Sequence, residues 1–511
     1  MPDCARPARR VIHLLALLVA TCPPTAATIV EIGENDFRVS FMGGTGDETF
    51  GAQYPAVVYN GTDVEYLVVW SGNDDAPPLA GGKDEIWGQR IHAATGEHSG
   101  PRFRISFTGS DQNVTARAFD VDVAFNPIEH QFLVVWAANP GGAGMDPMEL
   151  EIYAQRLQAG TGQLVEGPSR VSRMGPDGDP QFRVGAPQVV FNPDRNEYFA
   201  VWHGKDDIGG LDADDTEIFS QRLDGNTGME FGFDDYRLSD AGALGDFLWA
   251  QLPQVAYNPS ATDYLVVWQG YDDAPGFHPA ETEIFGQRLD AGTTIPLGPN
   301  DFRVSDMGGT GDASYSAGRP AVVYNPTADE YFVVWEGRDF GQAAANDHEL
   351  FGQRLAGAEA IEVGANDAPL SSMGPPGTSG TWAGRPDVVF DESQGTYLVT
   401  FHGSDGADGQ IAFESEIFAA EIDPAGAPLP GGSRRLSAAG GLGDADVSEA
   451  RSPRLAQAEG SSDHLIVWFA DDTTAGLADD ESEIFGQRVR LPLFLDGFET
   501  GGTAGWSMTV P

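Results

Sequence analysis

The stretch Glu283-Ile284-Phe285-Gly286-Gln287-Arg288-Leu289-Asp290 decides the fold, because it recurs in edited form along the whole chain. Seven copies occur, and they begin at Glu85, Glu151, Glu217, Glu283, Glu349, Glu416 and Glu483. Consecutive copies are 66 or 67 residues apart. A constant period of this length indicates a repeat architecture, in which each repeat is one structural unit.

Each repeat holds three further short runs, exemplified by Phe37–Ser40 (FRVS), Pro55–Asn60 (PAVVYN) and Tyr66–Trp70 (YLVVW). All four runs are rich in β-branched and aromatic residues, and Gly, Pro, Asn and Asp bound them, so they are predicted to be strands. We name them strand A (PAVVYN), B (YLVVW), C (EIFGQR) and D (FRVS). They lack a strict alternation of apolar and polar residues, which indicates sheets that are covered on both faces.

Four strands per repeat, seven repeats and no helical period predict an all-β fold, a seven-bladed β-propeller with four antiparallel strands in each blade. The chain begins with a D strand and its last repeat ends at strand C. We therefore expect the FRVS run at Phe37 to pair with the last C strand and to close the ring. The D–A and B–C loops are longer than the A–B and C–D turns and should share one face. That face is the expected binding face.

The ends of the chain are predicted to lie outside the propeller, which should span residues 28–490. Residues 1–27 combine a cationic start, the apolar run Val11–Ala20 and the small residues Thr25-Ala26-Ala27, which is typical of an export signal. A lipid-anchored Cys22 is the alternative, and either route predicts a secreted or cell-surface protein. Residues 491–511 are expected to be a flexible tail.

The charge balance limits the partners. Lysine and arginine number 29 against 77 acidic residues, a net charge of −48. A surface of this charge repels nucleic acid and anionic membrane, so neither is an expected partner. No later run reaches the ~20 apolar residues of a membrane span. The remaining candidates are an extracellular protein or a glycan, bound by a monomer, and cations.

Residues that repeat around the ring are expected to be structural, because an active site is normally a single asymmetric constellation. The arginine of strand C should pair with a carboxylate of the neighbouring strand, such as Glu65 or Glu330. These arginines are Arg90, Arg156, Arg222, Arg288, Arg354 and Arg488. The tryptophan that ends strand B should lie in the core. These tryptophans are Trp70, Trp136, Trp202, Trp268, Trp335 and Trp468.

The loops of the expected binding face are rich in aspartate. Crowded carboxylates bind hard cations such as calcium, although Asp is also an ordinary turn residue and no regular calcium-loop motif occurs. The candidates in the D–A loops are Asp47, Asp179, Asp246, Asp312 and Asp444. The candidates in the B–C loops are Asp74, Asp75, Asp206, Asp207, Asp272 and Asp273.

A catalytic site should appear as broken symmetry. The position directly after the strand B aromatic is expected to point toward the binding face, and it varies from blade to blade. It holds His203, Glu336 and His402 in three blades, which are the candidates for acid–base or metal chemistry at the channel mouth. The alternative is that a variable position simply varies.

The repeat resembles exported bacterial β-propeller repeats of the pattern NPxxxEYLVVWxGxDD…EIFGQRLD, over roughly residues 33–490. The stretch Asp496–Gly501 with Trp506 resembles the DGFESG…W tails of exported bacterial proteins. The resemblance implies a secreted or surface seven-bladed propeller of unassigned role, and it identifies no catalytic residue in this sequence.

We therefore expect an exported, non-enzymatic binding or scaffold module, with calcium as a candidate stabilising ligand. The alternative is an extracellular polysaccharide hydrolase or lyase that uses carboxylates or histidines at the channel mouth. A third hypothesis is a structural protein whose acidity maintains solubility in salt.

Overall fold

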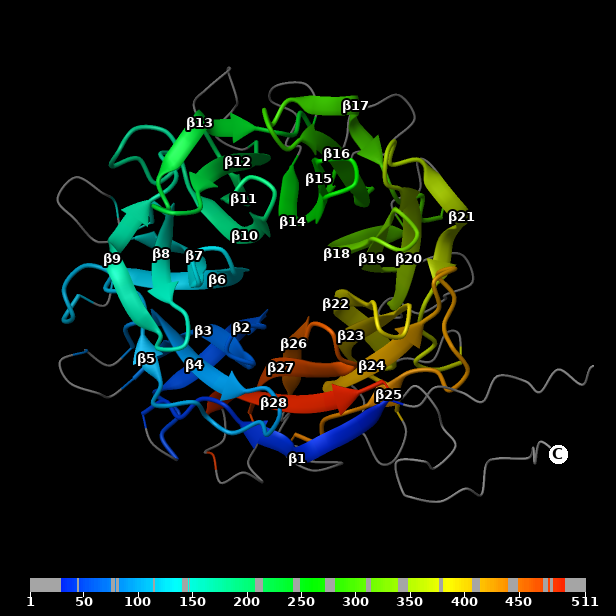
Figure 1. The fold of residues 1–511 in the computed structure, drawn as a ribbon, viewed down its shortest axis with the longest axis horizontal. Coiled ribbons are helices and arrows are strands. Elements are labelled where there is room, and N and C mark those ends of the chain that lie inside the picture. Colours follow the sequence, from blue (N-terminus) through cyan, green and yellow to red (C-terminus); the bar gives the residue numbers. More distant parts are fainter. Residues whose placement is uncertain are drawn as a thin grey trace, which may run out of the picture.

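The computed structural model describes residues 29–43, 46–74, 79, 82–113, 115–139, 146, 148–206, 215–241, 249–271, 281–308, 314–338, 348–375, 380–406, 414–439, 449–471, 477 and 481–491. Within this part of the chain all regular elements are strands, β1 to β28, and no helix occurs. They form seven four-stranded sheets arranged in a ring around a central axis (Figure 1). The predicted seven-bladed β-propeller is confirmed. No described helix is long and apolar enough to cross a membrane.

Each blade is an antiparallel meander from the channel to the rim, in the order A, B, C, D. The A strands are β2 (Gly51–Asn60), β6 (Arg117–Asn126), β10 (Val184–Asn192), β14 (Ala250–Asn258), β18 (Ser316–Asn325), β22 (Trp382–Asp391) and β26 (Ala450–Gln457). The B strands are β3 (Glu65–Asn73), β7 (Gln131–Asn139), β11 (Glu197–Gly204), β15 (Asp263–Gly270), β19 (Glu330–Arg338), β23 (Thr396–Ser404) and β27 (Asp463–Asp471).

The two outer rows follow the same order. The C strands are β4 (Glu85–His92), β8 (Glu151–Gln158), β12 (Glu217–Asp224), β16 (Glu283–Asp290), β20 (Glu349–Ala356), β24 (Glu416–Ile422) and β28 (Ser482–Arg490). The D strands are β5 (Phe103–Arg104), β9 (Gln163–Arg170), β13 (Glu230–Arg237), β17 (Pro296–Arg303), β21 (Glu362–Pro369), β25 (Arg434–Arg435) and β1 (Val30–Arg38).

The ring closes as the sequence predicts. Strand β1 pairs antiparallel with β28, with Val30 opposite Arg490 and Arg38 opposite Phe485. The N-terminal strand thus completes the blade that ends the chain, and the two ends of the propeller lie side by side (Figure 1). Closure by β1 covers the outward-facing edge of β28, which would otherwise be the unpaired edge of a three-stranded blade. The segments predicted as leader and tail, residues 1–27 and 491–511, lie outside the described residues except for Leu491.

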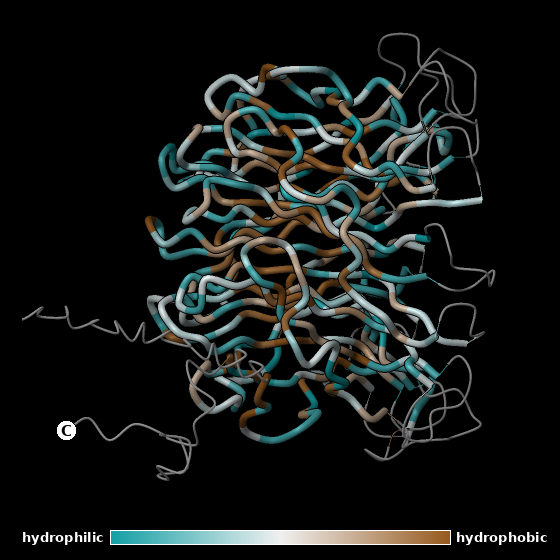
Figure 2. The backbone as a smooth tube through the Cα atoms, turned by 90° about the vertical axis from the view of Figure 1, so that its right-hand side faces the viewer, coloured by the Kyte–Doolittle hydropathy of each residue, from teal (hydrophilic) through white to brown (hydrophobic). Residues whose placement is uncertain are grey.

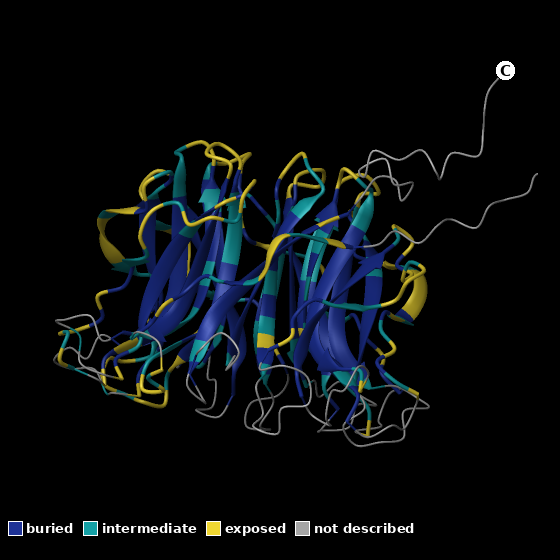
Figure 3. Ribbon diagram, turned by 90° about the horizontal axis from the view of Figure 1, so that it is seen from below, coloured by how far each residue is buried: buried dark blue, intermediate teal, exposed yellow. Residues whose placement is uncertain are grey.

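The core lies between neighbouring blades. The B strands are buried along almost their whole length, and Trp268 is 2% exposed. Figure 2 shows hydrophobic residues gathered along the strands, and Figure 3 shows that the inner strands are buried while exposed residues lie at turns and the rim. Each buried large side chain contributes about 1.5–3 kcal/mol. Because both faces of an inner strand touch another blade, both faces are apolar, as the missing alternation indicates.

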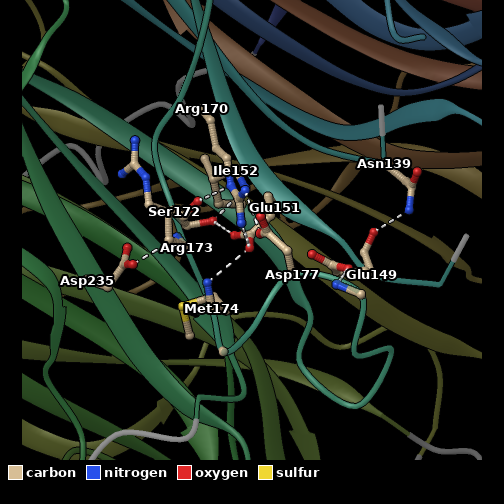
Figure 4. Close-up of polar contacts among 12 residues, drawn as sticks. Asn139, Glu149, Glu151, Ile152, Arg170, Ser172, Arg173, Met174, Asp177 and Asp235 are labelled. Carbon is tan, nitrogen blue, oxygen red and sulfur yellow. Dashed lines mark hydrogen bonds and ion pairs between the residues drawn. The ribbon is translucent and has the colours of Figure 1, made fainter. Parts of the chain in front are cut away.

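A buried glutamate–serine contact links strands C and D in every blade. The glutamate that begins the EIFGQR run accepts a hydrogen bond from the serine that ends the FRVS run, and that serine accepts one from the backbone N–H after the glutamate. In one blade Ser172 donates to Glu151 and accepts from the N–H of Ile152 at 2.8 Å, while Met174 N–H donates to the same carboxylate at 3.0 Å (Figure 4). The seven pairs are Glu85–Ser106, Glu151–Ser172, Glu217–Ser239, Glu283–Ser305, Glu349–Ser371, Glu416–Ser437 and Glu483–Ser40.

The buried glutamates should make stability depend on pH. Burial raises the pKa of Glu416 to about 7 from an ordinary value of 4.5. Because the pKa of Glu416 is higher in the folded than in the unfolded chain, its bound proton favours the folded state. This stabilisation is fully present below pH 4.5 and is lost as the pH rises to about 7. We expect Glu416→Gln, which cannot ionise, to gain stability relative to the wild type by about 1.4 kcal/mol per pH unit between pH 5 and pH 7.

Urea unfolding at a series of pH values measures this difference. The exposed residue Glu392 supplies the control. The variant Glu392→Gln should differ from the wild type by the same amount at every pH. A pH-independent difference for Glu416→Gln would contradict the prediction.

Candidate functional site

A ring of seven side chains surrounds the channel at one end of the propeller. In every A strand the register with strand B shifts at the same place, and the residue at the shift has a left-handed backbone conformation with φ between 46° and 53°. The seven residues are Tyr54, Asp120, Ala186, Leu252, Arg319, Arg385 and Ser452. We call them the bulge ring. A left-handed conformation in a non-glycine residue costs about 1–3 kcal/mol, and bulges of this kind are used to re-aim side chains next to functional sites.

All seven residues of the bulge ring line one cavity of about 330 Å³. Proline follows the bulge residue in six blades and valine in the seventh, at Pro55, Val121, Pro187, Pro253, Pro320, Pro386 and Pro453. Proline cannot donate to a sheet ladder and is therefore found at bulges. The bulge conformation of the backbone therefore repeats in all seven blades, whereas the side chain at the bulge changes around the ring. Arg319, Arg385, Ser452, Tyr54 and Asp120 form a polar arc over five consecutive blades, and Ala186 and Leu252 complete the ring with apolar groups.

The central cavity continues into two further cavities, and Asp120 lines all three. A cavity of about 460 Å³ shares Tyr54 and Asp120 with the central one and extends past Ser71 and Arg117. A third, of about 470 Å³, shares Asp120 and His203 with it. The three cavities thus adjoin one another at Asp120, and we call them together the groove.

The far end of this groove carries an aromatic pair. Trp249 lines the third cavity, and its ring centroid lies 4.5 Å from that of Tyr271. Both side chains are half-buried. A half-buried indole presents an apolar face on which a sugar ring can pack.

His203 lies in the groove. It occupies β11, and its side chain lines both the central and the third cavity. The backbone N–H of Leu252 lies 3.5 Å from its Nδ1, which places the ring proton on Nε2. A Cβ added to Gly185 would lie 2.9 Å from that Nε2 and 3.6 Å from Oδ2 of Asp120. Burial lowers the pKa of His203 to about 4, so the ring is neutral at pH 7 and donates one hydrogen bond.

Asp120 has the properties of a proton carrier. Burial raises the pKa of its carboxyl group, and this outweighs the opposing effects of the Ala186 N–H and of the Arg385 charge. The N–H of Ala186 donates to Oδ2 at 3.3 Å. A carboxyl group with a raised pKa keeps its proton closer to neutral pH and can act as a general acid.

The other two candidates from the sequence lie behind the bulge ring. Glu336 accepts hydrogen bonds from the Arg319 side chain and, at 2.7 Å, from the backbone N–H of Arg385. His402 is 6% exposed and packs edge-on against Trp382 at 4.8 Å. Burial lowers its pKa well below the ordinary range, as do Arg385, Arg451 and Arg319. Neither residue lines the three cavities of the described groove. The three candidates therefore do not converge, and only His203 reaches the groove.

Sequence reasoning missed the bulge ring. It selected the position after the strand B aromatic, which supports the backbone of the next blade: Gln269, at this position, accepts the N–H of Arg319 at 2.8 Å. One feature of the sequence could have indicated the ring. The residue before the repeated proline of strand A varies around the ring, although the residues after it are similar between repeats.

The acidic loop residues are described only in part. Asp75, Asp207, Asp246, Asp272, Asp273, Asp312 and Asp444 lie outside the described residues. The described ones accept backbone N–H groups: Asp47 from Thr49 at 3.1 Å, Asp179 from Gln181 at 3.0 Å, Asp74 from Gly43 at 3.1 Å and Asp206 from Gly175 at 3.2 Å. No group of three or more His, Cys, Asp or Glu suited to a metal ion occurs in the described part of the chain. Calcium binding stays a prediction.

The repeated arginines and tryptophans lie within and between the blades. Arg90 contacts Glu65 and Arg354 contacts Glu330, each at 2.9 Å. Arg222 and Arg288 have the equivalent partners Glu197 and Asp263. In addition, Arg222 donates to the carbonyl of Gly292 in the next blade at 2.7 Å. The remaining members are Arg156, which contacts Glu166, and Arg488, which lies 3.9 Å from Asp463. The tryptophans Trp70, Trp136, Trp202, Trp268, Trp335 and Trp468 are all buried.

Comparison with known proteins gives structural matches only. No family model and no curated protein matches the chain. The α-L-arabinofuranosidase of Fusarium graminearum is 13% identical, with a TM-score of 0.45 over 76% of this chain and 98% of that one. A polysaccharide lyase is 10% identical, with a TM-score of 0.49 over 91% and 100%. The α-L-arabinanase of Penicillium chrysogenum is 13% identical, with a TM-score of 0.42 over 91% and 100%. Identities this low show the fold alone.

The expectation of a non-enzymatic binding or scaffold module gives way to its alternative, an enzyme acting on a polysaccharide, because the bulge ring gathers one asymmetric set of polar side chains in a single cavity. The structures named above are a glycosidase, a lyase and an arabinanase. The physical reason for the error lies in the repeats. The conspicuous motifs of the sequence are the repeated, structural ones, and the asymmetric residues stand at a bulge that no motif marks.

Proposed function

We propose that this protein is an enzyme that cleaves an extracellular polysaccharide in the groove across the channel end. One observation carries the proposal. The seven blades are built alike, yet three adjoining cavities at the axis bring together a single asymmetric set of polar groups, and Asp120 lines all three. Three adjoining cavities of about 330, 460 and 470 Å³ suit a chain-like substrate better than a small molecule. Its centre holds proton-transfer groups, and one end holds the Trp249 and Tyr271 rings.

The chemistry follows from the groups at the centre. Asp120 acts as the acid–base residue, because its raised pKa keeps a proton available for the leaving glycosidic oxygen. His203, neutral with its proton on Nε2, donates a hydrogen bond that orients the substrate beside Asp120. Tyr54 adds a hydroxyl group on the other side of Asp120, and its ring is held edge-on against Phe469 at 5.3 Å. Protonation of the leaving oxygen serves hydrolysis and elimination alike.

The test is an assay of the purified chain against a panel of neutral, uronate-containing and sulfated polysaccharides. New reducing ends, with a shift of the products to lower mass, are expected for at least one class. Ultraviolet absorbance of an unsaturated uronate would distinguish elimination from hydrolysis. The proposal fails if protein that unfolds cooperatively on heating releases no reducing ends from any polysaccharide of the panel.

A further inference from the structure

A half-buried arginine in the central cavity, Arg385, has no carboxylate partner among the described residues. The side chain of Arg385 reaches from β22 into the cavity and makes one hydrogen bond to a described residue, from Nη1 to Oγ of Ser452 at 2.9 Å. Guanidinium carries five N–H donors, and a described residue accepts one of them. A desolvated cation without a counter-ion is costly, and an anionic ligand relieves this cost.

The acidic groups around Arg385 are already engaged. Glu336 receives the side chain of Arg319 and the backbone N–H of Arg385. Asp120, on the opposite side of the ring, accepts the Ala186 N–H. A third acid, Asp387, lies 4.0 Å from Arg454. No nearby carboxylate of the described residues is left for the Arg385 guanidinium.

Further positive charge gathers at the same place. Arg319 and Arg454 line the cavity with Arg385. The pKa of Arg385 is lowered by burial and by the charges of Arg319 and Arg454, while Tyr54 and Glu336 oppose this effect. This cationic cluster is notable in a chain with a net charge of −48. At physiological ionic strength charges are screened over about 8 Å, so the cluster acts on a ligand inside the cavity independently of the acidic exterior.

We propose that the groove takes an anionic polysaccharide and that Arg385, flanked by Arg319, binds the carboxylate or sulfate group of the sugar placed beside Asp120. Arginine matches planar carboxylates and sulfates by paired N–H bonds, which also fixes the orientation of the sugar. This inference rests on the proposed function for the location of the substrate, and it adds the substrate class.

Binding is measured without turnover, by calorimetry on the Asp120→Asn variant. The probes are a uronate oligosaccharide, a sulfated oligosaccharide, a neutral oligosaccharide of equal length and inorganic sulfate. We expect one of the two acidic oligosaccharides to bind at least ~30-fold more tightly than the neutral one, and Arg385→Gln to remove this preference by a similar factor. Arg385→Lys should restore it only in part, because a lysine lacks the paired donors.

The control is Arg195→Gln, which removes the same charge from an exposed arginine beside Glu197 at the A–B turns. It should leave both affinities unchanged. Equal affinity for neutral and acidic oligosaccharides, or a preference that survives Arg385→Gln, overturns the inference. So does binding of inorganic sulfate alone, which would make the cluster a simple anion site. Tight binding of an acidic oligosaccharide that the wild type does not cleave would instead overturn the enzymatic proposal and leave this inference standing.

Discussion

A chain that begins at residue 41 is expected to lose more than ~5 kcal/mol of stability relative to one that begins at residue 29, and to aggregate. The shorter chain lacks β1, which closes the ring on β28. It also leaves the fully buried carboxylate of Glu483 without Ser40 and Arg38. Removing one partner of a buried charge costs about 3–5 kcal/mol, and the newly exposed edge of β28 invites pairing with another chain.

Size-exclusion chromatography and thermal unfolding of the two chains measure the effect. Two single substitutions, compared with the truncated chain, separate the effect of ring closure from the effect of losing one glutamate–serine contact. Ser40→Ala and Ser106→Ala each remove the serine from one glutamate–serine pair, at the closing blade and at an internal one. Both should cost about 1–3 kcal/mol. A monomeric chain from residue 41 with the melting temperature of the longer chain would show that β1 does not close the ring.

Asp120→Asn is expected to lower kcat by ~10²–10⁴, because the amide cannot carry the proton that the leaving oxygen needs. The same strand offers a matched control. Asp122, two residues further along β6, is also buried, and burial raises its pKa to about 6. Its carboxylate accepts the N–H of Val189 at 2.8 Å and does not line the described groove. An asparagine at this position can still accept that hydrogen bond, so Asp122→Asn should retain wild-type kcat.

The pH dependence gives a second readout. If Asp120 acts as the acid, the wild-type rate falls as the pH rises through its raised pKa, and Asp120→Asn removes this limb from the residual activity. Equal losses of kcat in Asp120→Asn and Asp122→Asn would assign Asp120 a structural role. So would a pH–rate profile of Asp120→Asn that keeps the wild-type fall at high pH.

Much of the architecture was predictable because it is repeated. Seven copies of one motif average out local ambiguity, so strand order, blade number and closure by the Phe37 strand all followed from the period. The face with the long loops was also predictable, since antiparallel strands alternate in direction. The C-strand glutamates and D-strand serines were visible as repeats, yet their pairing needs the register between two strands, which the sequence does not display.

The site was not predictable in the same way. Sequence reasoning found His203, because it broke the symmetry of a repeated position. It also expected Glu336 and His402 at the channel mouth, whereas Glu336 accepts the backbone N–H of Arg385 and His402 packs against the ring of Trp382. It missed Tyr54, Asp120 and Arg385, since a bulge is a property of the strand pair and no single residue type marks it.

The sequence by itself therefore determined the fold, because a seven-fold period of apolar runs leaves one way to bury both faces of every sheet. Only the tertiary structure decided the site. The seven residues of the bulge ring are 66 or 67 positions apart along the chain, and they meet only when the ring closes. The left-handed turn of the backbone at each bulge then brings these variable side chains, Arg385 and Asp120 among them, to the lining of one cavity at the axis.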